Sequence, residues 1–135
     1  MVSIAGSCLC GAISFECEDR FNEFHFCRCT QCQKMTGSAH AANLFTDPDN
    51  IIWKSGEDMI ARYDIPGRTM TSCFCTTCGS PVPFVSTSGK SLVVPAGSLN
   101  KTPETTPQDN IFWCERASWY DEGLKSVKYN GFPDC

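Results

Sequence analysis

Apolar positions along the chain recur in short alternating runs rather than at helical spacing. Ile13, Phe15 and Cys17 alternate with polar residues, which is the period-two pattern of a half-buried strand. Seven further short apolar runs are separated by turn-forming residues, and they cover Phe24–Cys27, Asn43–Phe45, Ile51–Lys54, Ile60–Tyr63, Thr69–Phe74, Ser91–Val94 and Asn110–Trp113. The pattern therefore predicts a mainly β protein built from many short strands.

Helical segments are predicted at only two short stretches. Thr30–Thr36 is followed by Gly37, and glycine commonly ends a helix in the left-handed conformation. Arg116–Glu122 is similarly followed by Gly123. Asn100–Gln108 is polar with two prolines, so we predict a surface loop. With 135 residues and no internal repeat, the chain is predicted to form a single domain over residues 1–135.

Cysteine is unusually frequent, and its arrangement favours metal binding over disulfides. The chain has 11 cysteines, close to the level of a disulfide scaffold or a metal protein. Their number is odd, and many lie two or three positions apart, where a disulfide is strained but shared ligation of one ion is easy. Met1–Phe15 lacks the basic and apolar regions of a secretory signal peptide. We therefore predict a cytoplasmic metal protein.

The charge pattern argues against two classes of partner. The formal net charge is −4, and no run of Lys and Arg occurs, so the chain lacks the basic footprint of a nucleic-acid-binding protein. The longest apolar runs are far shorter than the ~20 residues that span a membrane. We predict neither a nucleic-acid nor a membrane partner, and the sequence leaves the oligomeric state open.

Four cysteines in two distant pairs predict a structural zinc site. Cys8 and Cys10 are two apart on an extended segment, so their side chains point to the same side. Cys75 and Cys78 form a CxxC turn, with Gly79 relieving the tight backbone that follows. Two thiolate pairs complete the tetrahedron that structural zinc prefers. The alternative is that these residues are buried free thiols.

Three cysteines within six residues predict a second metal site of a different kind. Cys27, Cys29 and Cys32 form a CxCxxC motif where a strand meets a predicted helix. Three protein ligands with an open fourth position is the arrangement of catalytic zinc, which binds and deprotonates an external thiol or water. The alternative is a closed, purely structural site whose fourth ligand is one of Cys73, His25, His40 and Cys114.

The remaining cysteines have less defined roles. Cys73 forms another CxC with Cys75, so it could replace one ligand in either cluster. Cys17 lies on the apolar face of a predicted strand and is predicted to pack in the core. Cys135 is the final residue and is predicted to be mobile.

The order of these motifs resembles that of a known family. Residues 6–13 read GSCLCGAI, residues 27–34 read CRCTQCQK and residues 74–80 read FCTTCGS, and Gly97–Leu99 and Arg116–Trp119 add two later pieces. Together they resemble the glutathione-dependent formaldehyde-activating enzyme family, also called the centromere-protein-V-type domain, over residues 4–120.

This resemblance implies a fold, two metal sites and an activity. The fold is the β-tent, shared with a zinc-containing exchange-factor chaperone group. A structural zinc is implied at Cys8, Cys10, Cys75 and Cys78, and a catalytic zinc at the CxCxxC cysteines. The implied reaction is a carbon–sulfur lyase reaction, in which glutathione and formaldehyde condense to S-hydroxymethylglutathione or the adduct breaks down. Arg28 and Asn110 depart from the family pattern, which usually has histidine at the first position and often at the second.

The residues and the resemblance together favour an enzyme acting on a thiol–carbonyl adduct. Glutathione is the expected thiol co-substrate, and Arg28, Lys34 and Arg116 are candidates to neutralise its carboxylates, although each residue is more often a solvated surface charge. Trp119 and Phe112 are candidate walls of the substrate site, with core packing as the alternative. Two other functions remain possible: hydrolysis of an imine or another carbonyl adduct, and a non-catalytic module in which closed zinc sites stabilise a protein-binding surface.

Overall fold

Short β-strands dominate the structure, a computed structural model that describes residues 2–133. One sheet has three strands in the order β1 (Ser3–Ser7), β2 (Ser14–Glu18) and β5 (Ile52–Ser55). A second sheet has five strands in the order β10 (Asp109–Ile111), β3 (Glu23–Cys27), β4 (Ala41–Thr46), β9 (Leu92–Pro95) and β8 (Phe84–Val85). A separate hairpin pairs β6 (Ile60–Asp64) with β7 (Thr71–Cys75). The predicted mainly β fold is confirmed.

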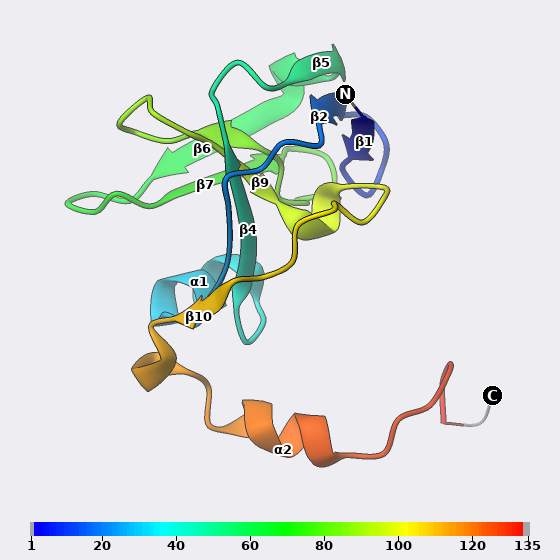
Figure 1. Ribbon diagram of the computed structural model, residues 1–135, viewed down its shortest axis with the longest axis vertical. Coiled ribbons are helices and arrows are strands. Elements are labelled where there is room, and N and C mark those ends of the chain that lie inside the picture. The colour runs from blue at the N-terminus through cyan, green and yellow to red at the C-terminus, as the bar shows by residue number, and fades with distance from the viewer. Residues whose placement is uncertain (1, 134–135) are drawn as a thin grey trace.

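Helices are short and lie mainly at one end of the molecule. The two α-helices are α1 (Thr30–Thr36) and α2 (Trp119–Lys125), and the 3-10 turns are η1 (Glu57–Met59), η2 (Ala96–Ser98) and η3 (Trp113–Glu115). Figure 1 shows α2 and the chain beyond it set apart from the sheets. In residues 2–133, neither seven-residue α-helix has the length or apolar character needed to cross a bilayer.

The predicted elements mostly form, with corrections at the two ends of the chain. Ser3–Ser7 has little strand propensity, yet all five residues pair with β2 and form β1. The β10 strand runs parallel to β3, and Trp113 begins η3 instead of extending the predicted strand Asn110–Trp113. Gly123 lies inside α2 rather than ending it, because the backbone becomes extended only at Ser126.

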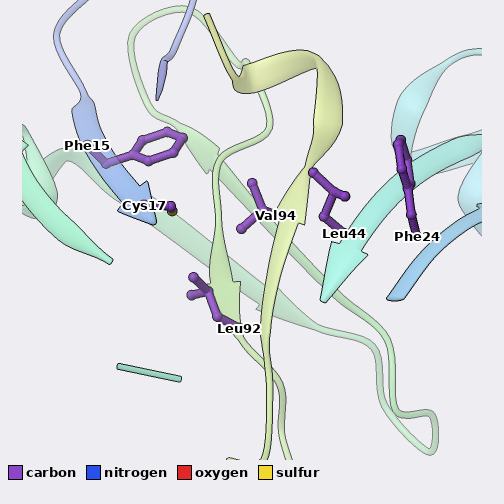
Figure 2. Close-up of a cluster of buried hydrophobic side chains, with 6 residues drawn as sticks. All are labelled: Phe15, Cys17, Phe24, Leu44, Leu92 and Val94. Carbon is purple, nitrogen blue, oxygen red and sulfur yellow. The ribbon is translucent and has the colours of Figure 1, made fainter. Parts of the chain in front are cut away.

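The main core lies between the two larger sheets. Its buried members come from β2, β3, β4 and β9, and Figure 2 draws them: Phe15, Cys17, Phe24, Leu44, Leu92 and Val94. The predicted core position of Cys17 is thus confirmed. A Cβ atom at Gly6 would clash with the Phe15 ring, so only glycine fits where β1 passes this core. Two smaller apolar clusters surround the cysteine motifs, so the folded chain itself gathers the sulfur atoms.

Candidate metal centres and cavity

The four-cysteine cluster (Cys8, Cys10, Cys75 and Cys78) has the spacing of a tetrahedral metal site. All four sulfur atoms lie within 4.8 Å of one another. The Cys8 and Cys10 sulfurs are 3.6 Å apart, and those of Cys10 and Cys75 are 3.9 Å apart. A zinc ion with bonds of ~2.3 Å to four sulfurs places those sulfurs about 3.8 Å apart, whereas a disulfide brings them to ~2.0 Å. The donor set therefore fits a tetrahedral metal ion such as zinc.

Backbone and hydroxyl groups contact three of the four sulfurs, those of Cys8, Cys75 and Cys78. The backbone N–H of Ile13 donates to the Cys8 sulfur at 3.3 Å, and that of Thr77 donates to the Cys75 sulfur at 3.4 Å. The Ser80 hydroxyl oxygen accepts from the Leu9 N–H at 3.0 Å and lies 3.3 Å from the Cys78 sulfur. This side-chain hydrogen bond with Ser80, assisted by backbone hydrogen bonds, lowers the pKa of Cys78 to about 5. The cluster thus joins the β1–β2 turn to the end of β7.

The three-cysteine cluster (Cys27, Cys29 and Cys32) forms where β3 meets α1. Cys27 ends the strand, Cys29 caps the helix, and the Cys32 backbone N–H donates to the Cys29 sulfur at 3.3 Å. The three sulfurs lie within 4.8 Å of one another, and all three residues are buried. Burial raises the pKa of Cys27 and of Cys32, so their thiolates need a positive partner at neutral pH. A divalent cation bound by the three sulfurs would supply that charge.

No fourth cysteine, histidine or carboxylate joins the three-cysteine cluster within residues 2–133. Of the four residues considered as closing ligands, His25 hydrogen-bonds to carboxylates and His40 lies beside a guanidinium group. Cys114 is exposed in η3. Cys73 lies outside both cysteine clusters.

A large cavity of about 880 Å³ opens beside the three-cysteine cluster. All three cysteines line it, together with residues from β4, β7 and the loops around β8. Met70, Phe84 and Phe112 contribute apolar wall, and Cys73 also lines the cavity, with burial raising the pKa of its thiol. Its volume lies within the range of small-molecule sites. The three sulfurs are thus positioned to act on a molecule that enters this cavity.

Comparison with known proteins identifies the family to which this chain belongs. The model of the glutathione-dependent formaldehyde-activating enzyme family matches residues 3–115. The chain belongs to this family. No curated protein matches it significantly. A solved structure of a Rhodobacter sphaeroides protein, 22% identical, superposes with a TM-score of 0.60 over 78% of this chain and 98% of that chain, so the two share a fold.

Arg28, one of two departures from the family's histidine pattern, is a buried cation rather than a solvated one. Its side chain is 2% exposed, and it forms no ion pair within residues 2–133. Its Nε and Nη2 atoms donate to the Asn110 side-chain oxygen at 3.2 and 2.9 Å. Its Nη1 lies 3.1 Å from His40 Nδ1, and its Cζ lies 4.0 Å from the centre of the Tyr120 ring. The two residues that depart from the family pattern therefore contact each other.

This contact predicts a large stability loss when Arg28 becomes methionine. We expect the free energy of unfolding to fall by about 2–4 kcal/mol, because the buried Arg28 side chain loses its charged hydrogen bonds to Asn110 and His40 and its packing on the Tyr120 ring. Urea denaturation would measure this. Arg20→Met is the matched control, since the Arg20 side chain is more exposed and pairs only with surface carboxylates. A double-mutant cycle with Asn110→Ala should give a coupling of about 1–2 kcal/mol. Equal losses for the two arginines would contradict the assignment.

The other predicted substrate contacts lie away from the large cavity. Lys34 and Trp119 line a separate, smaller cavity of about 310 Å³, together with Thr30 and Gln33 of α1. Arg116 lies 3.9 Å from an Asp121 carboxylate oxygen and packs on the Trp113 ring. Neither these residues nor Arg28 line the cavity that contains the three cysteines. Of the two aromatic residues considered as walls, only Phe112 lines it.

His25 contributes an imidazole group to the same cavity wall. Its Nδ1 lies 2.6 Å from an Asp109 carboxylate oxygen, and its Nε2 lies 3.2 Å from a Glu23 carboxylate oxygen. The hydrogen bond to Asp109, and secondarily the one to Glu23, raises the pKa of His25. Both ring nitrogens are thereby occupied by carboxylates, so the imidazolium form is favoured and neither nitrogen is free to ligate a metal.

Proposed function

We propose that this protein is a zinc-dependent enzyme that forms or breaks the carbon–sulfur bond of a thiol–carbonyl adduct such as S-hydroxymethylglutathione. One observation carries the proposal: three buried thiols lie within 4.8 Å of one another on the wall of an 880 Å³ cavity, with no fourth cysteine, histidine or carboxylate in residues 2–133 beside them. Membership of the glutathione-dependent formaldehyde-activating family supports the choice of substrate.

The roles of the chain's own residues follow from their positions. Cys27, Cys29 and Cys32 would hold the catalytic ion, while the four-cysteine cluster would hold a structural one that ties the β1–β2 turn to β7. A bound zinc supplies Lewis acidity and lowers the pKa of a thiol that reaches it. The apolar parts of the cavity wall, such as Met70 and Phe84, would lower the local dielectric and strengthen electrostatic interactions beside the sulfurs.

The reaction itself needs no further co-reactant. The substrate sulfur attacks the formaldehyde carbon and forms the carbon–sulfur bond, while the carbonyl oxygen takes up the proton that the thiol loses. The reverse reaction releases the thiol and the aldehyde. A cytoplasmic location, where thiols stay reduced, fits this chemistry.

The test is an exchange measurement on the zinc-loaded protein. We expect it to accelerate the interconversion of glutathione, formaldehyde and their adduct above the spontaneous rate, as followed by NMR of labelled formaldehyde. No acceleration by protein carrying two zinc ions, beside an active member of the family, would refute the proposal. Turnover of an imine without added thiol would instead support the hydrolase alternative, and a fourth protein ligand in X-ray absorption spectra would support the non-catalytic module.

A further inference from the structure

The wall of the large cavity holds a single Lys or Arg side chain, that of Arg68. Apart from the cysteines, the other ionisable residues on the wall are His25 and Glu115. His25 is already held by two carboxylates, and the Glu115 carboxylate accepts from the backbone N–H and hydroxyl of Thr30, each at 3.3 Å. Arg68 forms no ion pair or side-chain hydrogen bond with any of residues 2–133. Its positive charge is therefore free to meet a ligand.

The β6–β7 hairpin fixes the backbone that carries Arg68. Ile65 N–H donates to the Met70 carbonyl at 3.0 Å, and Arg68 N–H donates to the Ile65 carbonyl at 3.1 Å. Gly67 takes a φ of 73°, which glycine adopts without strain. Figure 1 shows this hairpin extending away from β4. Its other arginine, Arg62, is already paired with Asp64 at 3.1 Å, so the two arginines of the hairpin differ in availability.

The same hairpin reaches the three-cysteine cluster. Met70 packs against the buried apolar group that contains all three cysteines. Arg68 lies two residues before Met70 in the turn of the hairpin, and both residues line the same cavity as the three cysteines. A thiol whose sulfur approaches the cysteines would therefore place a carboxylate several bonds away within range of Arg68.

We propose that Arg68 binds a carboxylate of the thiol substrate and makes the β6–β7 hairpin selective for acidic thiols. This inference rests on the proposed function, because it assigns a subsite for the substrate of that reaction. The protein carries a net charge of −4, which disfavours the approach of an anion unless a cation on the cavity wall offsets it. A guanidinium group binds carboxylates through paired, charge-assisted hydrogen bonds.

Binding of S-methylglutathione to zinc-loaded protein tests the proposal without requiring turnover. The methylated sulfur cannot form a thiolate, so calorimetry reports mainly on the carboxylates. We expect Arg68→Ala to raise the Kd about tenfold or more, Arg68→Lys to recover part of the affinity, and Lys90→Ala to bind as the parent does. Lys90 is an exposed cation on the neighbouring β8–β9 loop, outside the cavity wall. The diethyl ester of the ligand should bind the parent and Arg68→Ala equally.

The outcomes separate this inference from the proposed function. Unchanged affinity in Arg68→Ala, equal binding of acid and ester by the parent, or no binding by the parent at millimolar concentration would each overturn the role of Arg68. Turnover assays with glutathione and with uncharged 2-mercaptoethanol then address the enzyme itself. If both thiols are turned over and the rates do not depend on Arg68, the result supports the proposed enzyme activity and refutes the carboxylate subsite at Arg68. If the parent binds S-methylglutathione more tightly than Arg68→Ala but shows no turnover, the result supports the subsite and refutes the proposed reaction.

Discussion

Replacing Cys10 by serine is expected to lower the melting temperature by at least ~10 °C and to release one bound metal ion. Cys10 is exposed, so its side chain contributes little to apolar packing. Its sulfur nevertheless lies 3.6 Å from that of Cys8 and 3.9 Å from that of Cys75. Because a structural zinc site contributes directly to folding free energy, losing one of its four ligands has a large effect at a surface position.

The control for this experiment is Cys114→Ser. Cys114 is also exposed but belongs to neither cysteine cluster, so its replacement should leave both the melting temperature and the metal content unchanged. Differential scanning calorimetry and elemental analysis supply the two readouts. If both variants have the melting temperature of the parent protein and retain two metal ions each, the four-cysteine cluster is not a structural metal site.

Cys29→Ser is expected to reduce turnover of the glutathione–formaldehyde adduct by more than ~100-fold. Loss of an outer-sphere partner typically lowers metal affinity or activity by about 10–100-fold, and Cys29 would be a direct ligand. Serine is a favoured residue at a helix N-cap, so it can replace the Cys29 sulfur as acceptor for the Cys32 backbone N–H. The variant should therefore keep α1 and the four-cysteine metal ion while losing the second ion.

Cys17→Ala separates this loss from general destabilisation. Cys17 is buried in the main core, away from both cysteine clusters, so its replacement should lower the melting temperature without changing kcat/KM or metal content. The catalytic assignment would be wrong if Cys29→Ser retained parental kcat/KM, or if Cys17→Ala lost as much activity at a temperature where both variants are folded.

Local spacing explains why the cysteine clusters and most strands could be predicted from the sequence. Cys27, Cys29 and Cys32 fall within six residues, so one strand-to-helix junction brings their sulfurs together. The alternation of apolar and polar residues from Ile13 to Cys17 was sufficient to predict that Cys17 packs in the core. Gly37 marked the end of α1, where the structure has the expected left-handed conformation. In each case the information lies within a few residues of chain.

Features that depend on distant contacts could not be predicted in this way. Arg28 was expected at the surface because an isolated arginine usually is, and only Asn110 and Tyr120, far along the chain, explain its burial. Arg68 carries no local signal, because its place on the cavity wall depends on how the β6–β7 hairpin lies beside the three-cysteine cluster. The β1 strand likewise exists only through its pairing with β2.

The stacking of Tyr120 on Arg28 sets a limit on how far the chain can be shortened. The family match ends at Glu115, before α2 begins. A chain cut at that point would keep every cysteine of both clusters, yet it would uncover the guanidinium group of Arg28, the residue between Cys27 and Cys29 in the sequence. We therefore expect the stability of the fold to depend on α2, which lies beyond the segment that the family model matches.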